Sequence, residues 1–165
     1  MYQEEALSSL INYLQILKEV YMSTISSYLT LEHRSCDELL AKSEDAVHKN
    51  HSDAQALTQA FVDDLFSHLD KEERVMFPAF EQATGMSDGP TNMMRQEHMQ
   101  MRSLASSLVE AVQNSDNKRY FGLTETLMIL IQQHNMKEEQ MLYRMADQHL
   151  NPQAQTIIEL MDNMA

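Results

Sequence analysis

Apolar residues recur every three or four positions along almost the whole chain, and little in the sequence interrupts them. The 165 residues include only three glycines and three prolines, the residues that punctuate β-rich chains. Residue types that favour helices, among them Leu, Met, Ala, Glu, Gln and Lys, are abundant. This pattern predicts an all-α fold, and the length suits one domain, residues 1–165, with a single core.

Six stretches carry the helical spacing. We expect helices at about 4–21, 25–48, 54–83, 91–114, 119–148 and 152–164. Short turns make consecutive long helices antiparallel neighbours, so residues 25–148 predict an up-down-up-down four-helix bundle. The N-terminal helix 4–21 and the C-terminal helix 152–164 are additions to that bundle. The N-terminal helix is expected to cover one end of the bundle or to form a homodimer contact.

Two local features refine these helices. Pro78 falls late in the helix predicted at 54–83, where a proline should kink or end it. Asn151 is expected to cap the last helix, with Pro152 in its first turn, where a missing N–H costs nothing.

The charge of the chain limits its partners. There are 25 acidic and 12 basic residues, which gives a net charge of −13. That sign opposes binding to nucleic acid or to an anionic membrane surface, because phosphate contacts need Lys and Arg. Cys36 is the only cysteine, the first ten residues carry no basic side chain, and no uncharged apolar run reaches the length of a membrane span. We therefore expect a cytoplasmic protein.

One short pattern occurs twice. The stretch "HLDKEERVMFPAF" begins at His68, and "HNMKEEQMLYRMA" begins at His134. Residues four apart share one face of a helix, so His68 pairs with Glu72 and His134 with Glu138. Both pairs fall on the apolar stripe of their helices, and a glutamate directed into a core is costly unless its charge is met.

The helix before each pair supplies a further histidine on its inward side, His33 in "LEHR" and His98 in "QEHM". The two halves have almost the same spacing, since 35 positions separate His33 from His68 and 36 separate His98 from His134. A single His-x-x-x-Glu is usually a surface ion pair. Its duplication with matched inward partners instead predicts a dinuclear metal site in the middle of the bundle.

Six groups suit two metal ions. The expected ligands are His33, His68, Glu72, His98, His134 and Glu138. Each ion would take two imidazoles, both glutamates would bridge the ions, and an oxide or hydroxide would complete the bridge. Mixed imidazole and carboxylate ligands suit iron, with manganese or zinc as alternatives. We therefore predict two iron ions, joined as Fe–O–Fe or Fe–OH–Fe.

At these residues the chain resembles the hemerythrin-like (HHE cation-binding) family over about residues 25–148. The resemblance implies a four-helix bundle with an oxo- or hydroxo-bridged non-haem diiron centre, and it implies the same six ligands by position. Oxygen-carrying hemerythrins have a fifth histidine where this chain has Arg102, and a final His-x-x-x-x-Asp where it has Glu138 and Glu139. The site is closer to the four-histidine, two-glutamate pattern of the bacterial iron–sulfur cluster repair proteins. This predicts two similar two-histidine irons.

Several neighbouring residues are weighed against the same site. Lys71 is expected on the charged helix surface. Glu73 and Glu139 are expected to be solvated or ion-paired at helix edges, with Glu139 as the alternative bridge to Glu138. Asp64 is either a hydrogen-bond acceptor for a ligand imidazole or a plain surface residue. Cys36 is expected to be a small buried residue rather than a ligand for a soft metal, and the methionines at helical spacing are expected in the core. The remaining histidines are expected in solvent: His48, His51 and His149.

These features favour a binding or sensing protein over a dedicated enzyme. Our first hypothesis is a non-haem diiron protein that binds or reacts with a small molecule such as O2, NO or peroxide, or that senses redox or iron state. One alternative is an iron storage or donor module for iron–sulfur cluster repair. Another is a metal-free helical interaction protein, whose stability would not depend on chelators.

Overall fold

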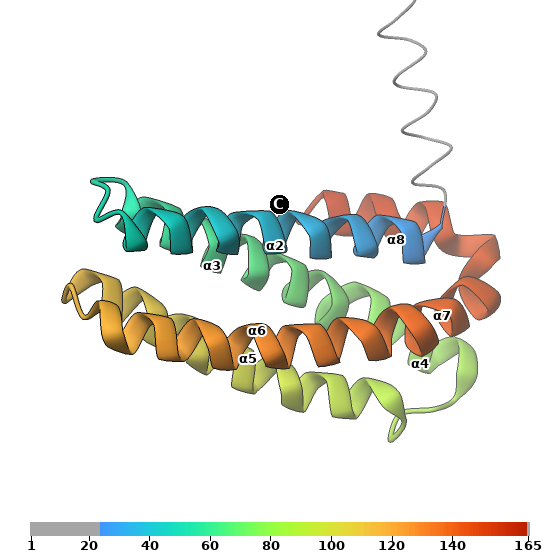
Figure 1. The fold of residues 1–165 in the computed structure, drawn as a ribbon. Coiled ribbons are helices and arrows are strands. Elements are labelled where there is room, and N and C mark those ends of the chain that lie inside the picture. The colour runs from blue at the N-terminus through green and yellow to red at the C-terminus, as the bar shows by residue number, and fades with distance from the viewer. Residues whose placement is uncertain (1–23, 165) are drawn as a thin grey trace, which may run out of the picture.

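The computed structural model describes residues 24–164, which form helices and turns without a strand (Figure 1). The elements in chain order are α2 (Ile25–His48), α3 (Ala54–Lys71), the π-helical segment Glu72–Met76, α4 (Phe77–Thr84), α5 (Pro90–Gln113), α6 (Asn117–Lys137), the π-helical segment Glu138–Leu142, α7 (Tyr143–Leu150), the 3₁₀ turn Asn151–Gln153 and α8 (Ala154–Asp162). The helix predicted at 4–21 lies outside the described residues, and so does the dimer contact that was predicted for it. Within residues 24–164, no helix is long and apolar enough to cross a lipid bilayer.

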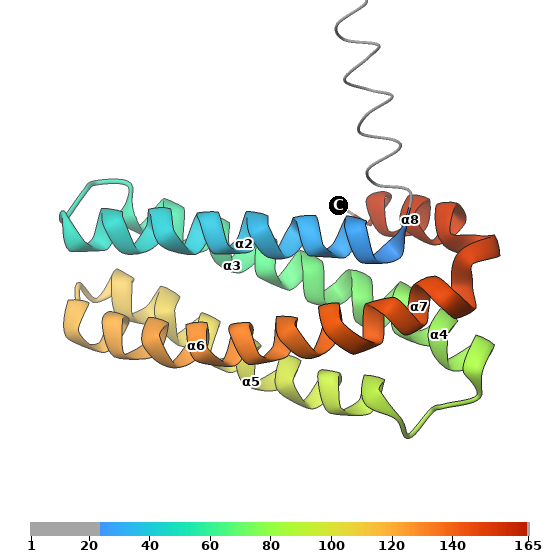
Figure 2. The ribbon, with the colours of Figure 1, turned by 45° about the vertical axis from the view of Figure 1, so that its right-hand side comes forward.

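Four rods make the bundle: α2, α3 continued by α4, α5, and α6 continued by α7. The helices α2 and α3 pack together as one hairpin, and α5 and α6 as another. The hairpins meet where α3 packs against α5 and α2 packs against α6 and α7. Figures 1 and 2 show the rods lying side by side, with neighbours in the chain running in opposite directions. The predicted all-α, four-helix architecture is confirmed.

The first helix of each hairpin ends in the same way. Asn50 and Ser115 have positive φ angles of 51° and 54°, a left-handed conformation that closes a helix. The next residues, His51 and Asp116, each donate a backbone hydrogen bond of 2.9 Å to the carbonyl five positions earlier. The shared turn geometry supports the interpretation of the bundle as two copies of one hairpin.

A π-helical segment follows each His-x-x-x-Glu pair. The backbone N–H of Phe77 donates to the carbonyl of Glu72, and that of Tyr143 to the carbonyl of Glu138, five residues back in both cases. The helix therefore continues past Pro78 to Thr84. The prediction allowed Pro78 to kink the helix or to end it, and the second alternative was wrong. Because the second half has the same segment without a proline, Pro78 is not its cause. Such segments are frequent at functional sites.

The apolar core has two parts. One cluster, which includes Leu65, Leu108 and Leu127, fills the half of the bundle nearer the two hairpin turns. The other gathers around Phe77 and Tyr143 and is covered by α8. The predicted C-terminal helix is thus present, but its start was wrong. Residues 151–153 form a 3₁₀ turn, and the following helix begins after Gln153 without a side-chain cap.

Candidate metal centre

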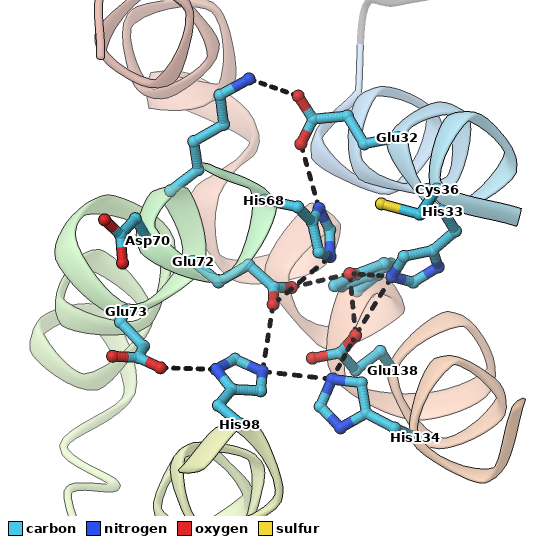
Figure 3. Close-up of polar contacts among 12 residues, drawn as sticks. Glu32, His33, Cys36, His68, Asp70, Glu72, Glu73, His98, His134 and Glu138 are labelled. Atoms are coloured by element: carbon cyan, nitrogen blue, oxygen red, sulfur yellow. Dashed lines mark hydrogen bonds and ion pairs between the residues drawn. The ribbon is translucent and has the colours of Figure 1, made fainter. Parts of the chain in front are cut away.

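The six predicted ligands come together between the two apolar clusters. His33, His68, His98 and His134 lie on α2, α3, α5 and α6, and both glutamates open the π-helical segments. Figure 3 shows their side chains converging from four rods onto one point. All six are at most 3% exposed. The structure thus confirms their predicted inward orientation, while their role as metal ligands remains a prediction.

The histidines form two pairs, one from each hairpin. The ring centroids of His33 and His68 are 4.7 Å apart, and those of His98 and His134 are 4.8 Å apart. Nε2 of His98 lies 3.1 Å from Nε2 of His134. Each pair therefore presents two neighbouring ring nitrogens to the centre, as two imidazole ligands of one ion would do.

The glutamates lie between these pairs. Oε2 of Glu138 is 3.3 Å from Nε2 of His33 and 3.1 Å from Nε2 of His134. Oε2 of Glu72 is 3.6 Å from Nε2 of His68 and 3.4 Å from Nε2 of His98. Each carboxylate thus contacts one histidine from each of the two hairpins, which is the arrangement that a bridging ligand needs.

Three buried polar atoms of this cluster have no hydrogen-bond partner. They are Nε2 of His68, Oε2 of Glu72 and Oε1 of Glu138, and the structure holds no other such side-chain atom within residues 24–164. Leaving a buried polar group unpaired costs about 1–3 kcal/mol each. Every orphaned atom belongs to the predicted ligand set, so the residues present fit a bound cation.

Four further carboxylates hold the outer nitrogens of the histidines. Nδ1 of His33 bonds Glu139 at 2.8 Å, Nδ1 of His68 bonds Glu32 at 3.0 Å, Nδ1 of His98 bonds Glu73 at 2.8 Å, and Nδ1 of His134 bonds Glu97 at 2.9 Å. With Nδ1 so engaged, each ring turns Nε2 toward the centre. A carboxylate in this place fixes the tautomer and raises the basicity of a metal-bound imidazole.

Basic side chains accompany three of these carboxylates. Lys71 donates to Glu32 and Lys137 donates to Glu97. Arg102 lies 3.6 Å from Glu73 and donates to Asp70 at 2.6 Å. The expectation that Lys71 is a surface residue was wrong, since it is only 7% exposed.

Glu73 and Glu139 were expected to be solvated or ion-paired at helix edges. Of these two alternatives the structure shows the pairing, because both are partly buried and their carboxylates contact histidine rings. The alternative of Glu139 as the bridge finds no geometric support, because Glu138 lies inside the cluster and Glu139 contacts His33 from outside. Together with Glu32 and Glu97, these outer glutamates were missed as functional residues. The sequence contained a signal for them. In both copies of the hairpin a glutamate directly precedes the first histidine, and a second glutamate directly follows the inner one.

The electrostatics show how strongly this cluster attracts positive charge. Burial would lower the pKa of His33, but Glu138 and Glu139 outweigh it and raise that pKa to about 9. The pKa of His98 is likewise raised to about 9, by its own two glutamate neighbours against the effect of burial. Burial opposes ionisation of Glu138, yet His134 and His33 keep its pKa well below the usual range. These raised pKa values favour protonated imidazoles, so a cation that binds here would compete with protons.

Two aromatic rings complete the centre, and sequence analysis missed both. Phe77 stacks on His98 with ring centroids 5.6 Å apart, and Tyr143 stacks on His33 at 5.5 Å. Phe77 lies five residues after Glu72, and Tyr143 lies five residues after Glu138. On a regular α-helix that position turns to another face, but one π-helical turn returns it to the same face.

The residues that were weighed and set aside lie as follows. Asp64 accepts a hydrogen bond from the buried thiol of Cys36 at 3.1 Å, so of its two expected roles the bond to a ligand imidazole was wrong. His48, His51 and His149 are exposed, as expected. Met94 and Met101 are core residues, whereas Met141 is 43% exposed, against expectation.

One of three comparisons with known proteins found a match. The family model for the hemerythrin HHE cation-binding domain matches residues 24–146. Searches of curated proteins and of solved structures gave no match. The matched range begins at the capping residue of α2 and ends within α7, so it contains all six predicted ligands.

Proposed function

The chain belongs to the hemerythrin HHE cation-binding domain family, and from this premise we propose that its buried cluster is a carboxylate-bridged diiron site. This site binds or reacts with a small molecule such as O2, NO or peroxide, or it senses redox or iron state. The observation that carries the proposal is the set of three orphaned atoms, on His68, Glu72 and Glu138, amid four histidines held with Nε2 inward. Imidazole and carboxylate donors in this mixture suit iron.

The ion balance supports two cations rather than one. The cluster and its outer layer contain six glutamates and three basic side chains: Glu32, Glu72, Glu73, Glu97, Glu138 and Glu139 against Lys71, Lys137 and Arg102. The excess is three negative charges, which is more than one divalent ion can offset. The donors also fall into two groups, one around His33 and His68 and one around His98 and His134.

The burial of the site limits what it accepts. The six side chains are at most 3% exposed, so only a molecule of a few atoms passes between them without unfolding the bundle. The same burial disfavours the alternative of an iron donor, which needs ligands that another protein reaches. A metal-free interaction protein leaves the three orphaned atoms unexplained.

Each residue then has a defined task. Glu72 and Glu138 would each contact both ions, and each histidine pair would hold one of them. The outer glutamates keep the histidine rings oriented and basic. Phe77 excludes solvent beside His98, and Tyr143 excludes it beside His33. Two irons, when bound, supply redox chemistry in which two electrons reach one small molecule together.

The test is to load the purified protein anaerobically with Fe(II), count iron by emission spectrometry and record the visible spectrum after exposure to air. We expect about two irons per chain and a new ferric absorption band. His68→Ala and His134→Ala should each lower the iron content by about one half or more. His51→Ala and His149→Ala, which change exposed histidines, are the matched controls and should keep full iron content. No iron in the unmodified protein would refute the proposal.

A further inference from the structure

The phenol oxygen of Tyr143 lies among the predicted ligands themselves. It is 3.0 Å from Nε2 of His33, 2.7 Å from Oε1 of Glu72 and 2.9 Å from Oε2 of Glu138. The residue is completely buried, and its ring stacks on His33, which fixes the oxygen in place. A phenol has one proton and can donate to only one of the two carboxylates. The phenol oxygen therefore lies within bonding distance of three of the predicted ligands at once.

A shared cation accounts for this convergence. Neighbouring donors in an octahedral shell with bonds of about 2.1 Å lie about 3 Å apart. The three distances around the phenol oxygen are close to that spacing. We propose that Tyr143 is a further protein ligand, bound as phenolate to the ion held by His33 and His68. The phenol proton leaves to solvent when the metal binds, and the oxygen takes the metal in its place.

The second hairpin provides the phenol, and the first does not. Tyr143 follows Glu138 by five residues, and Phe77 follows Glu72 by five. Phe77 stacks on His98 much as Tyr143 stacks on His33, but it has no oxygen to offer. The ion held by His98 and His134 therefore has one protein ligand fewer and keeps the open position. This inference rests on the proposed diiron site, and it replaces the predicted pair of similar irons with two unequal ones.

The charges near the two ion positions also differ, because the surroundings of His33 are more negative than those of His98. Four residues after the lone histidine of each hairpin stand Asp37 in the first and Arg102 in the second. Arg102 lies 3.6 Å from Glu73, the carboxylate that holds His98. In residues 24–164, no basic side chain pairs with Glu139, which holds His33. More negative surroundings favour the higher charge of a ferric ion, so the His33 position suits an iron(III) phenolate.

The experiment compares the unmodified protein with Tyr143→Phe and Phe77→Tyr. Each is loaded anaerobically with two equivalents of Fe(II), oxidised in air, and studied by iron counting, visible absorption and resonance Raman spectroscopy. The unmodified protein should show a phenolate-to-iron(III) band that enhances tyrosine ring vibrations. Tyr143→Phe should lose this band completely while retaining bound iron. Phe77→Tyr places a phenol beside His98 and should add a second phenolate contribution.

Azide, an anion that binds open ferric positions, reports on the other ion. We expect one azide per chain in the oxidised unmodified protein, and a second one in Tyr143→Phe. Two irons per chain without tyrosine-enhanced vibrations would overturn the ligand assignment and leave the diiron site standing. Two azides in the unmodified protein would overturn the inequality of the ions. Absence of bound iron would overturn both this inference and the proposed function.

Discussion

The bundle buries two polar clusters, and they differ in how their atoms are paired. In the half near the hairpin turns, Ser43 lies 2.8 Å from the hydroxyl of Thr58 and 2.6 Å from that of Tyr120. Thr58 also donates to the carbonyl of Ala54 at 2.8 Å. Every hydroxyl in this cluster has a partner, so it is complete as it stands. The six-residue cluster is equally buried but leaves three atoms unpaired.

This difference teaches which buried polar groups indicate a ligand. Burial alone does not, because Ser43, Thr58 and Tyr120 are also completely buried and satisfy one another. Unpaired atoms that converge from separate helices do, because nothing within the described chain offsets their desolvation. The comparison predicts that one cluster depends on added metal and the other does not.

Removal of metal should produce the largest effect. Excess chelator should lower the free energy of unfolding of the loaded protein by about 4 kcal/mol for each ion present at 1,000 times its Kd. The reason is that metal binding is coupled to the folded arrangement of all four rods. Thermal denaturation with and without chelator measures the change. If the melting temperature does not change when chelator is added, the six-residue cluster does not depend on metal, and the predicted difference between the two clusters is wrong.

Glu138→Gln should come next, because this carboxylate contacts one histidine of each pair. The amide replaces one oxygen by a group that cannot bind a metal, and it removes a bridging charge. We expect iron content to fall from about two per chain to below one, measured by emission spectrometry. Glu125→Gln, an exposed position on α6, is the matched control and should leave the iron content unchanged.

Glu139→Gln should have a smaller effect than Glu138→Gln, although the two residues are adjacent. Glu139 holds Nδ1 of His33 from outside the cluster. The loss of such an outer carboxylate typically costs about 10–100-fold in metal affinity. A competition titration should show this loss for one ion only. If Glu139→Gln instead removes both ions and Glu138→Gln removes neither, the assignment of the bridge is reversed.

The sequence was sufficient for the fold and for the six residues that converge in the buried cluster. Helical spacing located every long helix of residues 24–164, since each rod buries one continuous stripe. The repeat then separated His68 and Glu72 from an ordinary surface pair, because the same arrangement occurs at His134 and Glu138. Both inferences concern residues on one helix, where the geometry is set by the backbone.

The outer glutamates and Tyr143 could not be obtained in the same way. The bond from His68 to Glu32 crosses between two helices, and its partner depends on how they pack. Tyr143 reaches the site because the π-helical segment shifts the following residues around the axis, and no proline marks that segment. The two copies do share the five-residue spacing from Glu72 to Phe77 and from Glu138 to Tyr143. That spacing does not show which way the two aromatic rings face.

The smallest effect belongs to the self-satisfied cluster. Tyr120→Phe removes a hydroxyl and leaves Ser43 and Thr58 bonded to each other. We expect a loss of about 1 kcal/mol in the free energy of unfolding, or about 2–4 °C in melting temperature. The loss should be the same in loaded and in chelated protein, and iron content should not change. Thermal denaturation of both forms measures this, with Tyr143→Phe for comparison. A fall in iron content for Tyr120→Phe would mean that the two clusters are coupled along the bundle. Hydrogen bonding in one cluster would then affect metal binding in the other.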